Sequence, residues 1–139
     1  MGVRKLRGLT MQETSMQKLL KIPRLFTGDD GQSHWDEVEV DLSPVLSDGV
    51  MSDRSSLQGT TSISFRVAPA DTFVDWHPAP RRQYVINLAG EVEVGIGDGT
   101  KRRFGPGGVF LAADLTGQGH TSQGIGSVPR VSAYIPLAD

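Results

Sequence analysis

Apolar and polar residues alternate with a period of two over most of the chain from residue 60 onward. Successive side chains of a strand point to opposite faces of a sheet, so this alternation is typical of strands with one buried face. Glycine- and proline-rich turns separate the segments, and no helical pattern alternates with them, which favours a sandwich or barrel. We predict an all-β fold with strands over residues 38–42, 63–67, 84–88, 92–96, 101–104, 109–113 and 131–135.

The first 24 residues differ from the rest in charge and pattern. Six basic residues and one acidic residue give this segment +5, and the formal net charge of −2 leaves −7 for the remainder. Residues 10–13 fit a capping box, and apolar residues recur at helical spacing, which predicts a short helix over residues 11–20. We expect residues 1–24 to form an N-terminal arm or helix and residues 25–139 to form the barrel domain.

The arm suggests how the protein assembles. A basic arm beside an acidic body fits either a nucleic-acid tail or a segment that lies on an acidic surface. The arm is short and lacks interleaved aromatic residues, so we favour the second reading and expect a homodimer in which the arm packs on its neighbour. Nucleic acid is not expected as a partner, because the net charge is −2. Residues 43–59 carry turn residues such as Ser43-Pro44 and Asp48-Gly49, and we expect a loop there.

Length and composition narrow the class of protein. A chain of 139 residues suits one domain, and 37% hydrophobic with 22% charged residues is typical of a soluble globular protein. No apolar run is long enough to span a bilayer, and no signal-peptide pattern follows the basic start, so no membrane partner is expected. The chain has no cysteine, which excludes disulfides and thiolate chemistry and agrees with a cytoplasmic location.

Two motifs carry the most specific signal. His77 is followed by Gln83 and Gly90, and a second group of residues contains Gly108, Gly117 and His120. The spacing resembles the two motifs of the cupin superfamily, with alanine at the second histidine of the first motif, glutamine at its glutamate, and an aspartate at the proline of the second. The resemblance covers roughly residues 60–137. It implies the cupin double-stranded β-helix, a small jelly-roll barrel with a pocket in its mouth.

The resemblance also implies a metal site. Cupins hold a divalent metal through histidines and a glutamate, so His77, Gln83 and His120 are the candidate ligands here, with iron, manganese, zinc or nickel as the implied cofactor. An amide oxygen brings no charge to a cation and is a weaker ligand than a carboxylate. The alternatives are that both histidines are hydrogen-bonded pocket residues, or that they orient a substrate without metal.

Strand parity selects further candidates. If Gln83 points into the barrel, Asn87 points in with it, and an extended chain brings Arg81 to the pocket mouth. Arg81 and Asn87 are therefore candidate substrate-binding residues, since guanidinium binds carboxylate or phosphate and an amide offers hydrogen bonds. Asp114 is a candidate acid/base group, a partner that holds His120 in one tautomer, or a loop cap. His34 lies outside both motifs and is expected near a turn.

Two functions remain open from the sequence. The first is a small-molecule cupin enzyme that acts on a small polar organic substrate, with His77, His120 and Asp114 as catalytic residues and metal as a Lewis acid or oxygen-activating centre. The second is a metal-free binding module or sensor for a small molecule. The motifs do not choose between oxygenase, isomerase and lyase chemistry.

Overall fold

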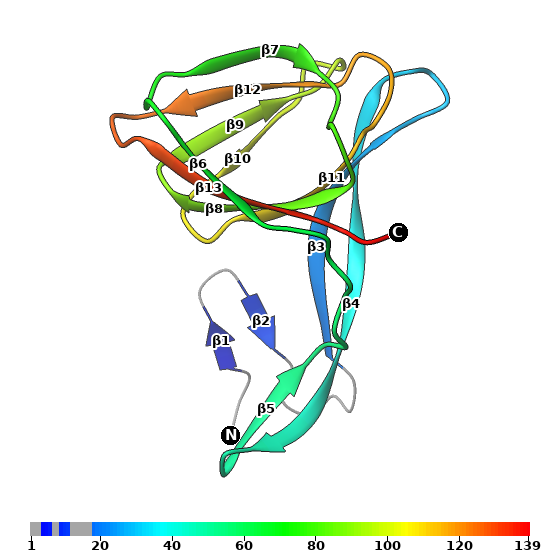
Figure 1. The fold of residues 1–139 in the computed structure, drawn as a ribbon, viewed down its shortest axis with the longest axis vertical. Coiled ribbons are helices and arrows are strands. Elements are labelled where there is room, and N and C mark those ends of the chain that lie inside the picture. Colours follow the sequence, from blue (N-terminus) through cyan, green and yellow to red (C-terminus); the bar gives the residue numbers. More distant parts are fainter. Residues whose placement is uncertain (1–3, 7–8, 12–17) are drawn as a thin grey trace. The chain divides into compact units, whose positions relative to one another are not determined.

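A computed structural model describes residues 4–6, 9–11 and 18–139 of the chain (Figure 1). These residues form thirteen strands and no helix, so the all-β prediction is confirmed. Within this described part, no helix is long and apolar enough to cross a membrane.

The chain divides into two compact units, and the division differs from the predicted boundary at residue 24. One unit comprises residues 1–21 and 38–57, and the other comprises residues 22–37 and 58–139. The expected barrel domain began at residue 25, whereas the structure groups residues 38–57 with the N-terminal segment. Two long strands, β3 (Lys18–Thr27) and β4 (Ser33–Ser47), contribute residues to both units.

The larger unit is a barrel of two sheets that face each other (Figure 1). The smaller sheet has the strand order β10 (Lys101–Phe104), β9 (Glu91–Gly95), β12 (His120–Ile125), β7 (Phe73–His77), and all of its pairs are antiparallel. In the other sheet, this unit's part of β3 lies beside β11 (Val109–Ala113), followed by β8 (Gln83–Ala89), β13 (Arg130–Pro136) and β6 (Ser64–Ala68). Here β3 and β11 run parallel and the other pairs are antiparallel.

Inward-facing apolar side chains of both sheets form the core of the barrel. Aromatic rings at Phe104 and Phe110 pack with centroids 4.8 Å apart, and Trp35 packs against both of them at 5.8 and 5.9 Å. The core also contains Leu25, Ala79, Val85, Val92, Val94, Ile96 and Ala112. Gln83, Val85 and Asn87 are buried along β8, as the predicted parity requires.

Strand β6 is the edge of its sheet, and it directs its apolar side chains outward. Ile63, just before this strand, and Phe65 and Val67 within it are exposed. The polar residues Ser64 and Arg66 on its opposite face line the inside of the barrel. The alternation predicted for residues 63–67 is therefore present, but the polar face is the inner one.

The structure of the smaller unit differs from two predictions, and the first concerns the expected loop. The expected loop over residues 43–59 contains a hairpin in which β4 pairs with β5 (Val50–Arg54) from Ser43↔Arg54 to Ser47↔Val50. Asp48 and Gly49 both have positive φ, at 52° and 73°, the conformation that a tight two-residue hairpin turn needs. The Asp-Gly pair was thus a hairpin turn rather than part of a loop.

The predicted helix over residues 11–20 is wrong wherever the structure describes these residues. Met11 belongs to β2 (Leu9–Met11), which pairs with β1 (Arg4–Leu6), and Lys18 begins β3. Residues 12–17, with the centre of that prediction, lie outside the described residues. Strand pairing overrides a short helical spacing, because most helical stability comes from tertiary packing rather than from propensity.

Candidate functional site

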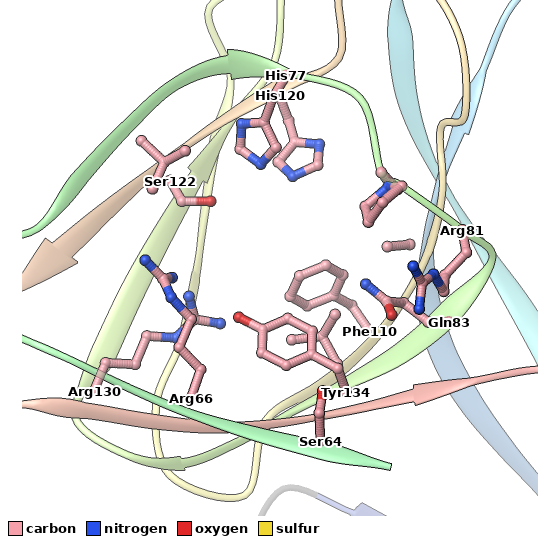
Figure 2. A pocket seen from close by; sticks show the side chains of 15 residues that line it. Ser64, Arg66, His77, Arg81, Gln83, Phe110, His120, Ser122, Arg130 and Tyr134 are labelled. Atoms are coloured by element: carbon pink, nitrogen blue, oxygen red, sulfur yellow. The ribbon is translucent and has the colours of Figure 1, made fainter. Parts of the chain in front are cut away.

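A cavity of about 380 Å³ lies inside the barrel, lined by strands of both sheets (Figure 2). No aspartate or glutamate is among its lining residues, whereas arginines and histidines are. The lining residues are Ser64, Arg66, Val74, His77, Ala79, Pro80, Arg81, Gln83, Val85, Phe110, Ala112, His120, Ser122, Arg130 and Tyr134. The wall therefore carries positive charge and several hydrogen-bonding groups over an apolar floor.

His77 and His120 lie next to each other at one end of the cavity, with their ring planes tilted by 56°. They are opposite residues in the β7–β12 pair, and their ring centroids are 4.4 Å apart. Gly119 makes this approach feasible: its φ is +77°, and a Cβ there would lie 2.0 Å from the carbonyl oxygen of His77. The glycine before His120 thus allows the two strands to bring both imidazoles to one wall.

A buried aspartate, Asp114, forms a hydrogen bond with the ring of His120. This aspartate is 0% exposed, and its Oδ2 accepts hydrogen bonds from His120 Nδ1 and from Ser33 Oγ, both at 2.7 Å. Its Oδ1 is buried without a hydrogen-bond partner among the described residues. Asp114 does not line the cavity. It can therefore affect a molecule in the cavity only through His120.

Hydrogen-bond partners set the tautomers of both imidazoles. A carboxylate oxygen and a backbone carbonyl oxygen can only accept a hydrogen bond. Nδ1 of His120 therefore carries a hydrogen and donates it to Asp114. Nδ1 of His77 likewise donates to the Asp75 carbonyl, at 2.7 Å. The Nε2 atom of each neutral ring is then an acceptor. Figure 2 shows a nitrogen of each ring facing the cavity. Two proton acceptors are thereby presented to one bound molecule.

Arg66, Arg81 and Arg130 line the cavity away from the histidines (Figure 2). Arg130 is only 8% exposed, and its Nε donates to Asn87 Oδ1 at 2.9 Å. Burial lowers the pKa of Arg130 from its ordinary value, nearby Tyr134 raises it, and Arg66 lowers it again. The guanidinium groups of Arg66 and Arg130 thus lie together, on the side of the cavity away from Arg81 (Figure 2).

The donor set does not fit a divalent metal. Gln83, the third implied ligand, stands beside Arg81 on a different wall from the two histidines (Figure 2). No group of three histidine, cysteine, aspartate or glutamate residues suited to a metal occurs in residues 18–139 or the two short described strands before them. Three cationic side chains in the same cavity add repulsion toward a cation.

Other predicted residues lie elsewhere. Asn87 is buried beneath the cavity and does not line it; its Nδ2 donates to the Gly90 carbonyl at 2.7 Å while its Oδ1 holds Arg130. His34 contacts Asp30 at 2.9 Å and lines a separate surface hollow. Arg82, the neighbour of Arg81, pairs with Asp139 at 2.9 Å.

Sequence reasoning missed five polar residues of the cavity. These residues are Ser64, Arg66, Ser122, Arg130 and Tyr134. The only available signal was the polar face of residues 62–66, which the sequence pattern alone places toward solvent. Arg130 follows Pro129 after a glycine- and serine-containing turn, a position that usually leaves an arginine exposed.

Comparisons with known proteins concern the fold alone. No protein-family model matches the chain, and no curated protein sequence is similar to it. Among solved structures, the cupin domain of Schizosaccharomyces pombe Cnp3 is 14% identical, covering 89% of this chain and 86% of that one, with a TM-score of 0.42. A putative ethanolamine utilization protein Q from Salmonella typhimurium is also 14% identical, covering 88% and 99%, with a TM-score of 0.31. The fold of this chain consists of two facing sheets around a pocket.

Proposed function

We propose that the barrel is a metal-independent enzyme that transfers protons on a small, negatively charged organic molecule. The observation that carries this proposal is the arrangement of Asp114, His120 and His77 at the wall of a cationic cavity. A cavity of about 380 Å³ is within the range of small-molecule sites. The positive lining favours an anionic ligand over a neutral or cationic one.

His120 is the proposed general base. Its Nε2 can accept a proton from a bound molecule, and the ring then becomes an imidazolium. The buried carboxylate of Asp114, 2.7 Å from Nδ1, stabilises that cation and holds the ring in the productive tautomer. Ser33 keeps the carboxylate in place by donating to the same oxygen.

His77 is the proposed second proton carrier. Its ring lies 4.4 Å from that of His120, so one molecule can contact both. His77 can first take up a proton at Nε2 from water, and when His120 removes a proton from the ligand, His77 can return one at a neighbouring atom. Such a pair suits redox-neutral reactions, such as the isomerisation or epimerisation of an acidic carbon, in which the proton removed and the proton added balance.

Deuterium exchange tests this proposal without a known substrate. A panel of small hydroxy- and keto-carboxylates and phosphorylated sugars is incubated in D2O with the protein, and exchange at carbon is followed by NMR. We expect exchange for at least one anionic compound, and a decrease of about 100-fold or more in His120→Gln. His34→Gln is the matched control, because His34 lies outside the cavity, and it should retain full exchange.

The outcomes separate the two candidate functions. Exchange that persists in His120→Gln would contradict the assignment of the base. A panel compound that binds in the cavity and undergoes no exchange with the unmodified protein would overturn the enzymatic proposal in favour of a metal-free binding module or sensor.

A further inference from the structure

We infer that Arg66 and Arg130, with the hydroxyl groups of Ser122 and Tyr134, form an oxyanion subsite that binds a phosphoryl group of the ligand. All four residues line the same cavity, and Figure 2 shows them gathered at the end away from Arg81. The inference deepens the proposed function, because it states the ligand class for the site in which the histidines act.

Arg130 is held in place for this role before any ligand arrives. The Asn87 amide is fixed by donation from Nδ2 to the Gly90 carbonyl at 2.7 Å and to the Phe104 carbonyl at 3.3 Å. Its Oδ1 must then face Arg130 and accept the hydrogen bond from Nε. One edge of the guanidinium is thereby anchored, and its terminal NH2 groups remain for the cavity. A pre-oriented guanidinium loses little entropy when it binds an oxyanion in a bidentate manner.

Within residues 18–139, no acidic side chain balances the charge of Arg130. Among the same residues, no carboxylate forms an ion pair with Arg66 either. Buried charges are normally paired, because removing an ion from water is costly. Burial is the largest cause that lowers the pKa of Arg130, and the charge of Arg66 lowers it further. A bound anion would supply the missing partner for both groups.

Strand register explains why the two arginines meet. Ala68 is opposite Arg130 and Ser132 is opposite Arg66 in the β6–β13 pair, so the two arginines are diagonal neighbours on the inner face. Edge strand β6 leaves Arg66 exposed, whereas Arg130 is buried. The subsite therefore has one fixed guanidinium and one at the open side, where a ligand can enter.

The hydroxyl of Tyr134 completes the donor set. Ser132 Oγ donates to Tyr134 Oη at 3.1 Å, so the hydrogen of the tyrosine remains available for another acceptor. Figure 2 shows this hydroxyl directed toward the two arginines. Two guanidinium groups and two hydroxyl donors suit a tetrahedral dianion with three terminal oxygens better than a planar carboxylate with one charge.

The test measures binding of inorganic phosphate by isothermal titration calorimetry in low salt at about pH 7.5, where phosphate is largely dianionic. Sulfate, acetate and malonate are the comparison anions. We expect phosphate and sulfate to bind at least about 10-fold more tightly than acetate. Arg130→Gln and Arg66→Gln should each weaken phosphate binding about 10-fold or more, the usual effect of losing a charge-assisted hydrogen bond.

Control variants make the result specific. Arg54→Gln removes the same charge from an arginine that belongs to the other unit and does not line the cavity, so it should leave phosphate affinity unchanged. Arg130→Lys keeps the charge but loses the planar guanidinium that can donate two parallel hydrogen bonds, so it should bind phosphate more weakly than the unmodified protein. Because Arg130 is buried, circular dichroism must show that its variants fold. If they do not, exposed Arg66 decides the question alone.

Two results would overturn the inference. One is phosphate affinity that is equal in the unmodified protein and in Arg66→Gln. The other is tight binding of malonate with weak binding of phosphate, which would assign a dicarboxylate instead. The exchange assay depends on His120, whereas phosphate affinity depends on Arg66 and Arg130. Failure of the acid–base proposal and failure of this subsite are therefore separate outcomes.

Discussion

Replacing Asp114 with alanine should destabilise the barrel strongly, and the structure sets the size of the effect. The carboxylate is fully buried and accepts hydrogen bonds from His120 Nδ1 and Ser33 Oγ, each 2.7 Å long. Asp114→Ala leaves both donors buried without a partner, at about 1–3 kcal/mol each. The expected loss is thus about 2–6 kcal/mol, a large part of the roughly 5–15 kcal/mol that stabilises an average domain. Removing a buried charge offsets some of this loss, so the lower half of the range is the better expectation.

A double-mutant cycle with Ser33 isolates the hydrogen bond. Ser33→Ala alone should cost about 1.5–3 kcal/mol, because it removes a hydrogen bond to a charged acceptor. In Asp114→Ala the serine no longer has that acceptor, so adding Ser33→Ala should cost little more, and the coupling energy should be about 1–3 kcal/mol. Urea unfolding followed by tryptophan fluorescence gives these free energies. Asp71→Ala, at an exposed aspartate, is the control and should change stability by less than about 0.5 kcal/mol.

Additive losses of unfolding free energy in the two single variants would contradict this expectation. If the losses for Asp114→Ala and Ser33→Ala simply add, the two side chains are not energetically coupled and the short distance between them has no consequence. A loss below about 1 kcal/mol in Asp114→Ala would likewise show that His120 does not depend on the carboxylate. The second result would also contradict the role of Asp114 in the proposed proton transfer.

Four further predictions follow from other parts of the structure. Leu25→Ala should cost about 2–5 kcal/mol in urea unfolding, since Leu25 is 0% exposed in the core, and a loss under 1 kcal/mol would argue against that packing. Gly119→Ala should displace the site histidines and abolish any exchange activity, because its methyl group would overlap a β7 carbonyl oxygen; unchanged histidine NMR signals would contradict this. Hydrogen bonds from the hydroxyl and the amide of Thr100 lower the pKa of Asp98 below its ordinary 3.8. The stability that Asp98 contributes is therefore present above that value and lost as the pH falls through the lower folded-state pKa, so Asp98→Asn should flatten the acid side of the stability curve, and an identical curve would contradict this. Light scattering should show a dimer for the full chain and a monomer for a chain that begins at Ile22 if the N-terminal segment joins two copies, whereas a full chain that is monomeric, or a shortened one that still dimerises, would remove that role.

Local pattern was sufficient to predict most of the barrel. Residues 84–88 lie within β8, and residues 101–104 and 109–113 are β10 and β11. The motif resemblance directed Gln83 inward, and strand parity then gave Asn87 the same direction; both residues are buried. These features could be read from the sequence because a strand's period and its turn residues are properties of a few neighbouring positions.

Pattern alone could not decide which face of an alternating segment lies inside. The segment around β6 alternates as expected, yet Phe65 is exposed while Arg66 lines the cavity. The usual rule that apolar residues face inward fails there, because a polar pocket occupies the interior beside this edge strand. The same limit made Asn87 a predicted ligand contact, whereas it anchors Arg130 instead.

The sequence by itself determined the all-β class and the positions of many strands, and it singled out His77 and His120, which the structure brings next to each other. Only the tertiary structure decided that Asp114 stands behind His120, that Gln83 stands apart from both histidines, and that Arg66 and Arg130 meet. These relations depend on the register between strands distant in sequence and on how the two sheets close over each other. A one-residue change of register would turn every side chain of a strand to the other face, so pairing across the whole barrel, rather than any local pattern, places the charges of the pocket.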